Sequence, residues 1–236
     1  MSALAPPIES TATNAPLATS NGLRIPLGVE HFFLPHASWE LFTKFFSENP
    51  ERRMRLTYAD GEMFFMSPLP MHESWKELIG TFVKDLCTEL GINRRSMGST
   101  TWLKASAARG IESDECYYIA SEAMVRGKTE FDLARDPPPD LAIEIDATHS
   151  PIDRPAIYAA LGVPELWVYD GKTMTFFKLV AGKYEAIANS VSFPFLMPID
   201  IERHLAMIPT VPETAIALAW RQFVREKNPP TVPATT

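Results

Sequence analysis

The chain has 236 residues, 46% of them hydrophobic, which suits one α/β domain with a sizeable core. Its 22 basic and 29 acidic residues give a net charge of −7, which argues against a protein that coats nucleic acid non-specifically. Residues 1–21 lack the basic and apolar regions of a signal peptide, and no window is long enough to span a membrane, so we expect a soluble cytoplasmic protein.

The ends of the chain differ in composition from its centre. Residues 1–22 are rich in Ala, Thr, Ser and Pro and are predicted to be a disordered tail, as are residues 228–236. Residues 23–227 are predicted to form a single domain. The two cysteines, Cys87 and Cys116, have no metal-type spacing and are interpreted as small buried hydrophobic residues in a reducing compartment.

The first half of the domain contains two predicted helices and several strands. A short helix should begin after Ser38, and a hairpin should turn at Asp60-Gly61, with Glu62 leaving the turn. Apolar residues recur at helical spacing over 71–90, so this is the clearest helix, and His72 is expected on its solvated side. Segments 99–104 and 115–119 are predicted to pair as strands, with Asp114 entering the second.

Residues 140–146 alternate strictly between apolar and other side chains. On a strand, Leu141, Ile143 and Ile145 then face one side, and the remaining residues, including Glu144, face the other. Glu144 and Asp146 would lie about 6–7 Å apart, close enough to share one hydrated divalent cation. The alternative is a half-buried strand with a solvated acidic face.

The segment after this strand indicates whether its acidic face is buried. Asp153 is a good helix N-cap, and Gly162 with Pro164 ends the helix before a second strand at 165–169. A strand, helix and strand series implies parallel pairing and cover on both faces. Buried carboxylates need a metal ion or a basic partner, so both this interpretation and the solvated face stay open.

The charges are unevenly distributed along the chain. Residues 112–170 contain an acidic excess, whereas residues 91–109 contain only basic charges, and Arg52, Arg53 and Arg55 form a small cluster. A metal-dependent enzyme acting on a polyanion would show this pattern, although scattered surface charge does so too. Beyond 169 we expect hairpin strands at 174–179 and 184–187 and helices at 199–207 and 212–226.

Residues 137–170, with Asp-Gly-Glu-Met-Phe-Phe-Met-Ser-Pro upstream, resemble a large bacterial family of restriction endonucleases first catalogued as a domain of unknown function. The likeness spans about residues 35–190. It implies an α/β (α+β) restriction-endonuclease-like core of the PD-(D/E)xK type. In such a core a central mixed sheet is flanked by helices, here followed by C-terminal hairpins and helices.

The resemblance also implies site residues. Asp114 matches the first metal-binding acid and Glu144 the second, on neighbouring strands, while Glu62 and Asp140 match further acidic positions. The superfamily's lysine two residues after the second acid is here Asp146, and the basic residue of the following helix is Arg154. Ser113 replaces the expected proline before Asp114.

The leading expectation is therefore a DNA endonuclease that uses Mg²⁺ or Mn²⁺, held by Asp114 and Glu144 with Asp140, Asp146 or Glu62. Arg154 would contact the scissile phosphate, unless it forms a plain ion pair with Asp146 or Asp153. The DNA backbone would follow a basic set, Arg94, Arg95 and Lys104.

The sequence is also compatible with two other functions. One is a catalytically silent module that binds nucleic acid or protein on a nuclease scaffold, with its acids serving as structural partners of Arg154. The other is an enzyme acting on nucleotides or smaller phosphate esters. A homodimer is compatible with each of them.

Overall fold

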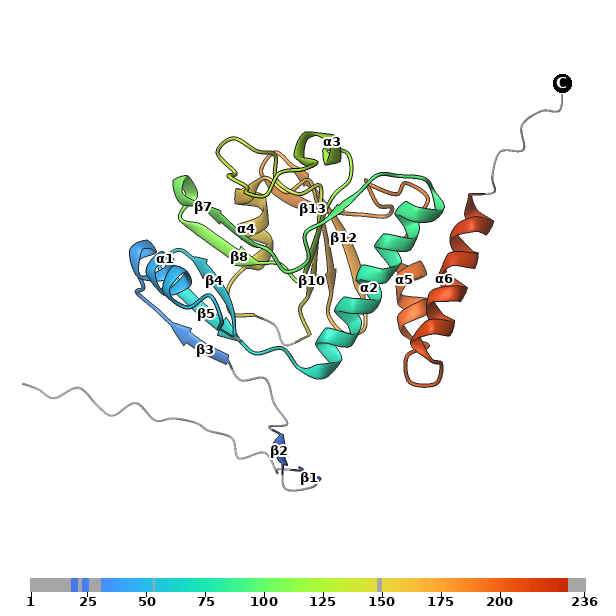
Figure 1. Cartoon of the computed structure of the whole chain (residues 1–236), viewed down its shortest axis with the longest axis horizontal. Helices are drawn as coiled ribbons and strands as arrows, with labels where there is room; N and C mark the ends of the chain where they lie inside the picture. Colours follow the sequence, from blue (N-terminus) through green and yellow to red (C-terminus); the bar gives the residue numbers. More distant parts are fainter. Residues whose placement is uncertain (1–17, 21–22, 26–30, 53, 148–149, 229–236) are drawn as a thin grey trace, which may run out of the picture.

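The computed structural model describes residues 18–20, 23–25, 31–52, 54–147 and 150–228. Within these ranges helices cover two larger β-sheets in a mixed α/β arrangement (Figure 1). Most of the two predicted tails lies outside the described residues, and Ala18–Ser20 (β1) pairs antiparallel with Leu23–Ile25 (β2). None of the described helices is long and apolar enough to cross a membrane.

The central sheet has six strands and is mixed. Its one parallel pair is β10 with β11, joined through helix α4 (Arg154–Leu161) as the sequence predicts, and its other neighbours are antiparallel. In spatial order the strands are β13 (Lys183–Ile187), β12 (Met174–Val180), β11 (Glu165–Tyr169), β10 (Leu141–Ile145), β9 (Glu115–Tyr118) and β6 (Arg95–Ser96).

Both faces of the central sheet are covered. Leu141, Ile143 and Ile145 pack on one face against Ile79 and Phe82, so the predicted facing of β10 is confirmed. Ala142 and Glu144 face the other side, toward α4. The helices of the first face are α2 (Pro70–Glu89), α5 (Pro198–Leu205) and α6 (Glu213–Lys227), each within a few residues of its predicted range.

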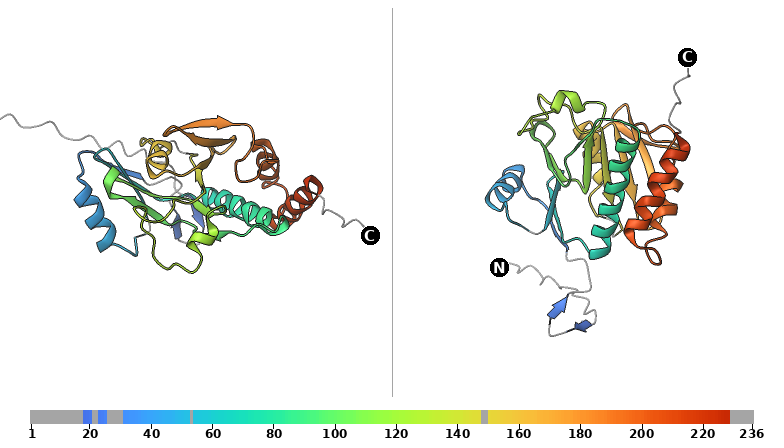
Figure 2. Two further views of the ribbon diagram at one scale, coloured as in Figure 1. Left: turned by 90° about the horizontal axis from the view of Figure 1, so that it is seen from above. Right: turned by 45° about the vertical axis from the view of Figure 1, so that its right-hand side comes forward.

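A second, five-stranded antiparallel sheet was not predicted as a separate unit. One of its faces packs against α4 and the central sheet, and its other face is covered by α1 (Trp39–Glu48), whose N-cap is Ser38 as predicted. Figure 2 shows α1 at one end of the molecule and α6 at the other. The strands, in spatial order, are β3 (His31–Leu34), β5 (Glu62–Met66), β4 (Arg55–Ala59), β8 (Arg109–Glu112) and β7 (Thr101–Lys104).

The predicted pairing of 99–104 with 115–119 is wrong. A single 3-10 turn (Ala105–Ala107), closed by Ala108 at a positive φ of 45°, returns the chain at once, so β7 pairs with β8. Strand β9 instead joins the central sheet between β10 and β6. A short helix, α3 (Glu122–Val125), follows it. The segment 109–112 lacks the apolar alternation that predicts a strand, because it begins with arginine and glycine.

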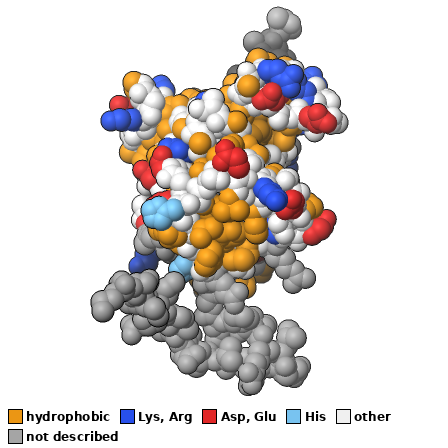
Figure 3. Space-filling view, turned by 90° about the vertical axis from the view of Figure 1, so that its left-hand side faces the viewer, with side chains coloured by type: hydrophobic (Ala, Val, Ile, Leu, Met, Phe, Trp, Pro, Cys, Tyr) orange, Lys and Arg blue, Asp and Glu red, His pale blue; other side chains and the backbone are white. Residues whose placement is uncertain are grey.

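The face that carries α1 and β3 has a broad apolar area (Figure 3). Its exposed large side chains on these two elements are Phe32, Phe33 and Leu41. On the inner side α1 lies directly on the sheet, since a Cβ atom at Gly110 would come within 2.5 Å of Phe42 Cζ.

The two cysteines are buried as predicted, and burial raises the pKa of Cys87 to about 11 and that of Cys116 to about 12.

The ion pairs between α2 and α6 should make stability depend on pH. Arg225 and Arg221 hydrogen-bond Glu89 and lower its pKa from 4.5 to about 2. A depressed carboxyl pKa contributes stability above pH 4.5, and this contribution is lost as the pH falls toward 2. Glu89→Gln should therefore melt a few degrees below wild type at pH 7, and thermal scans should show the difference shrinking between these two pH values. Glu77→Gln, on an exposed part of α2, is the matched control, and an equal loss in it would contradict the assignment.

Candidate active site

The candidate site lies where the chain passes from one sheet to the other. Strand β8 ends at Glu112 and β9 begins at Glu115, so Ser113 and Asp114 make the whole crossing. Asp114 is only 1% exposed, and its Oδ2 accepts a hydrogen bond of 2.6 Å from the backbone N of Ile145. The register pairs Ile143 with Glu115, so one step further along the ladder brings Glu144 beside Asp114. The two predicted acids are neighbours.

Asp114 is neutralised by a residue of the second sheet. Arg55 Nη1, from β4, forms an ion pair with Asp114 Oδ1, while Arg55 Nη2 lies 2.9 Å from Glu73 Oε1. Lys76 also contacts Glu73, at 3.0 Å. Arg55 therefore bridges a buried carboxylate and a carboxylate near the surface.

Glu144 is neutralised from the following helix. Arg154 Nη2 lies 2.5 Å from Glu144 Oε2, and the Tyr158 hydroxyl donates a hydrogen bond to the other oxygen. Arg154 also donates to the backbone O of Glu112 at 3.1 Å and reaches Thr57 Oγ1 at 3.5 Å. Asp153 caps the helix by accepting from the backbone N of Ala156, as predicted. Arg154 thus joins both sheets and pairs with Glu144, whereas the plain ion pair considered from the sequence was with Asp146 or Asp153.

Burial and these neighbours set the protonation of the site. Burial raises the pKa of Glu144, and the guanidinium groups of Arg154 and Arg55 with the Tyr158 hydroxyl restrain that rise. Burial opposes the charge of Arg154, but Glu144, Tyr158 and Asp146 together outweigh it and raise the Arg154 pKa. The contacts with Arg154 and Tyr158 favour the charged form of Glu144.

A small cavity opens onto this pair. It has a volume of about 220 Å³ and is lined by Glu144, Asp146, Asp153, Arg154 and Val168, among others. Asp146 Oδ1 accepts a hydrogen bond of 3.0 Å from the backbone N of Ser150. Three of the predicted site residues, Glu144, Asp146 and Arg154, thus face one cavity.

The other predicted acids lie further away. Asp140 precedes β10, four residues from Glu144, so the two are about 13 Å apart along the strand. Its Oδ2 accepts from Ile119 N, Ser121 N and Ser121 Oγ, which fixes the loop before α3. Glu62 is the first residue of β5 and pairs with Ala59 of β4. Ala59 lies about 7 Å along β4 from Thr57, the residue that Arg154 contacts. The structure does not bring Asp140 together with Glu144.

Two of the three basic residues assigned to the DNA backbone, Arg95 and Lys104, form hydrogen bonds within the chain. Arg95 donates to the carbonyl oxygens of Val125 and Lys128 and lies over the Phe131 ring. Lys104 Nζ donates to the backbone O of Ala160 at 2.7 Å, near the end of α4. Arg94 is half-buried. Their role toward nucleic acid remains a prediction.

Sequence reasoning missed two residues of the site, Arg55 and His72. His72 was expected on the solvated side of its helix, which is wrong: it is buried, and its Nε2 lies 3.4 Å from Asp114 Oδ2. Burial and the charge of Arg55 lower the His72 pKa to about 4, so the ring is neutral at neutral pH. The signal was available, because His72 precedes Trp75 by three and Ile79 by seven residues and so continues their stripe.

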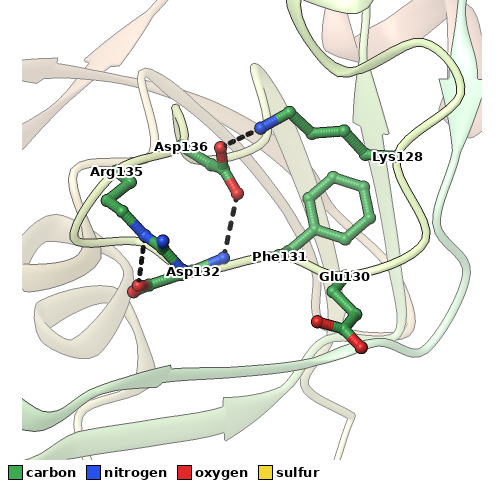
Figure 4. A pocket seen from close by; sticks show the side chains of 6 residues that line it. All are labelled: Lys128, Glu130, Phe131, Asp132, Arg135 and Asp136. Carbon is green, nitrogen blue, oxygen red and sulfur yellow. Dashed lines mark hydrogen bonds and ion pairs between the residues drawn. The ribbon is translucent and has the colours of Figure 1, made fainter.

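Another hollow lies away from these acids (Figure 4). It has a volume of about 290 Å³, and four of its charged side chains form two ion pairs, Lys128 with Asp136 and Arg135 with Asp132. Asp136 also accepts from the backbone N of Asp132. These contacts shape a loop, and we assign this hollow no role in the site.

The carboxylate oxygens of Asp114 and Glu144 are ligands that suit Mg²⁺ and Mn²⁺. In the described part of the chain, no three His, Cys, Asp or Glu side chains are grouped so as to hold a metal ion. A cation at this point would therefore depend on two carboxylates, with water or substrate oxygens completing its ligands.

The chain belongs to the Uma2 family, described as "Putative restriction endonuclease", whose model matches residues 39–203. A solved structure from Anabaena variabilis, described as a putative nuclease belonging to DUF820, is similar in fold, with a TM-score of 0.50 and 16% sequence identity. The match covers 69% of this chain and 97% of that one. No curated protein matches the sequence. The restriction-endonuclease-like fold expected from the sequence is thereby confirmed.

Proposed function

We propose that this protein is a divalent-metal-dependent endonuclease that hydrolyses phosphodiester bonds of DNA. The observation that carries the proposal is the meeting of Asp114, Glu144 and Arg154 at the junction of the two sheets, with the last two facing a cavity. Two carboxylates beside a guanidinium can hold a cation and a phosphate at one point. Membership of the family supports the same function.

In this proposal each residue has a defined task. Asp114 and Glu144 would hold Mg²⁺ or Mn²⁺, and Asp146, which lines the same cavity, could bind a water ligand of that ion. The bound ion would lower the pKa of a coordinated water and neutralise charge on the phosphate. Arg154 is the first residue of α4, so its guanidinium and the positive end of the helix both favour an anion.

A charge-only role follows from the chemistry of arginine. The guanidinium stays protonated at working pH, so Arg154 can orient the phosphate and stabilise its charge but cannot take a proton from water. Arg154 also contacts the backbone O of Glu112 and Thr57 Oγ1, and these two contacts orient its guanidinium for a phosphate.

Cleavage of plasmid and single-stranded DNA with Mg²⁺ or Mn²⁺, against the same reaction with EDTA, tests this function. We expect cleavage by wild type only with metal, and none by Glu144→Gln, which keeps the size of the side chain. Mn²⁺ should raise the melting temperature of wild type and do much less for Glu144→Gln, because only a native site binds the ion. Equal shifts in the two proteins would remove Glu144 from the site. Glu185→Gln, an exposed change on β13, is the control.

One observation favours a second function, a silent module that binds nucleic acid or protein. Each of the two acids already has an arginine partner within the chain, Arg55 for Asp114 and Arg154 for Glu144. Acids kept only for such pairing would serve stability. Wild type would then neither cut DNA nor gain stability from Mn²⁺, and the experiment above separates the two functions.

A further inference from the structure

The two arginines of the site share an unusual arrangement. Arg55 and Arg154 each bind one of the buried carboxylates and a second acceptor, Arg55 through its two Nη atoms and Arg154 through Nη2 alone. For Arg55 the second acceptor is Glu73 Oε1, at 2.9 Å, and for Arg154 it is the backbone O of Glu112, at 3.1 Å. Either arginine can therefore release its buried carboxylate and keep one partner.

The charges of the site restrict what can bind there. Asp114 and Glu144 carry two negative charges, and Arg55 and Arg154 balance them with two positive ones. A divalent cation on the carboxylates would leave a buried excess of positive charge, which is costly in a medium of low polarity. An anion entering with the cation would restore the balance. Phosphate groups are the anions that pairs of arginines bind best.

We infer that Arg55 and Arg154 exchange partners during ligand binding: they neutralise Asp114 and Glu144 in the protein alone, and they turn to a phosphate when a divalent cation takes these carboxylates. Arg55 is thereby a second phosphate-binding residue, and cation and phosphate bind cooperatively. The inference rests on the proposed function, since it uses the same two carboxylates as metal ligands.

Glu73 is the residue that allows Arg55 to move. Its side chain is 39% exposed and also contacts Lys76, so it stays solvated while it holds Arg55. With Glu73 present, the Arg55 charge keeps a partner after Asp114 is released. Without Glu73, the release would leave Arg55 unpaired, and the cation would bind less well.

The experiment measures binding of Mn²⁺ by calorimetry, with and without thymidine 3′,5′-bisphosphate, which carries phosphate but no phosphodiester bond to cut. In wild type the bisphosphate should tighten Mn²⁺ binding by at least about fivefold, and Mn²⁺ should tighten bisphosphate binding by the same factor. Arg55→Met should bind Mn²⁺ alone more tightly than wild type, because one positive charge is gone, and it should lose most of the coupling.

Glu73→Gln should change the affinity for Mn²⁺ in the opposite direction. Because Glu73 is half-exposed, this variant should fold even if Arg55→Met is unstable. It should bind Mn²⁺ alone more weakly than wild type and keep the coupling. The controls remove equal charges nearby: Arg52→Met for Arg55→Met, since Arg52 is as buried but pairs with Glu112, and Glu77→Gln for Glu73→Gln.

The outcomes distinguish this inference from the proposed function on which it rests. Mn²⁺ binding in wild type that the bisphosphate leaves unchanged would overturn the exchange of partners and leave the metal site standing. Equal effects of Arg52→Met and Arg55→Met would reduce the role of Arg55 to general charge and also overturn it. No Mn²⁺ binding with or without the bisphosphate would overturn both proposals.

Discussion

Arg154→Ala should lose about 3–5 kcal/mol of stability, because it leaves the buried Glu144 without its charged partner. Its rate of DNA cleavage should fall by more than about tenfold, which corresponds to about 1.4 kcal/mol or more of barrier. Urea denaturation gives the first quantity, and plasmid cleavage with saturating Mg²⁺ below the unfolding temperature gives the second. Arg135→Ala is the control, since its ion pair is exposed and should contribute about 1 kcal/mol or less.

Arg154→Lys separates two roles of the positive charge. An ammonium group keeps the charge but cannot bind Glu144 and the Glu112 carbonyl with the geometry of a guanidinium, so we expect a modest loss of rate. A lysine variant that cuts DNA much faster than wild type would show that the reaction needs a group able to give up a proton. An alanine variant as fast as wild type would leave Arg154 as a structural ion pair only.

Ile143→Ala should cost about 2–5 kcal/mol of stability, because it opens a cavity between β10 and α2. Ile143 is fully buried and lies in the center of its strand, opposite Trp167 on one side and Glu115 on the other. Its neighbours come from three elements, so the cavity cannot close by the movement of one. Urea denaturation measures the loss.

Val180→Ala is the matched control for Ile143→Ala. Val180 is also an aliphatic residue on a strand, but it is 38% exposed and lies at the end of β12. Its change should cost less than about 0.5 kcal/mol. Similar losses in the two variants would contradict the assignment of Ile143 to the core.

Local patterns made part of this fold predictable. The alternation along β10 and the recurrence of apolar residues along α2 each bury one face, so the sequence alone indicates which side chains meet. The same reasoning placed Asp114 and Glu144 on neighbouring strands only with help from the family resemblance. Nothing in the spacing of Asp114 marks it as more than a turn residue.

The rest of the site depends on contacts between segments far apart in the chain. Arg55 lies on β4 of the second sheet and Asp114 lies in the crossing between the sheets, and no periodicity relates the two. The sequence did not predict two separate sheets, because β8 is short and begins with the polar residue Arg109. His72 was assigned to solvent because polar residues on a first helical turn usually lie there, although its spacing from Trp75 indicated otherwise.

The two-residue crossing at Ser113 and Asp114 limits how the chain can change in length. An added residue here would shift β9 by one position and turn Cys116 and Tyr118 to the opposite face of the central sheet. The turn at Ala181-Gly182 joins two outer strands and can lengthen without moving any other element. Insertions are therefore tolerated at the outer hairpin, while the segment that carries the first acid must keep its length.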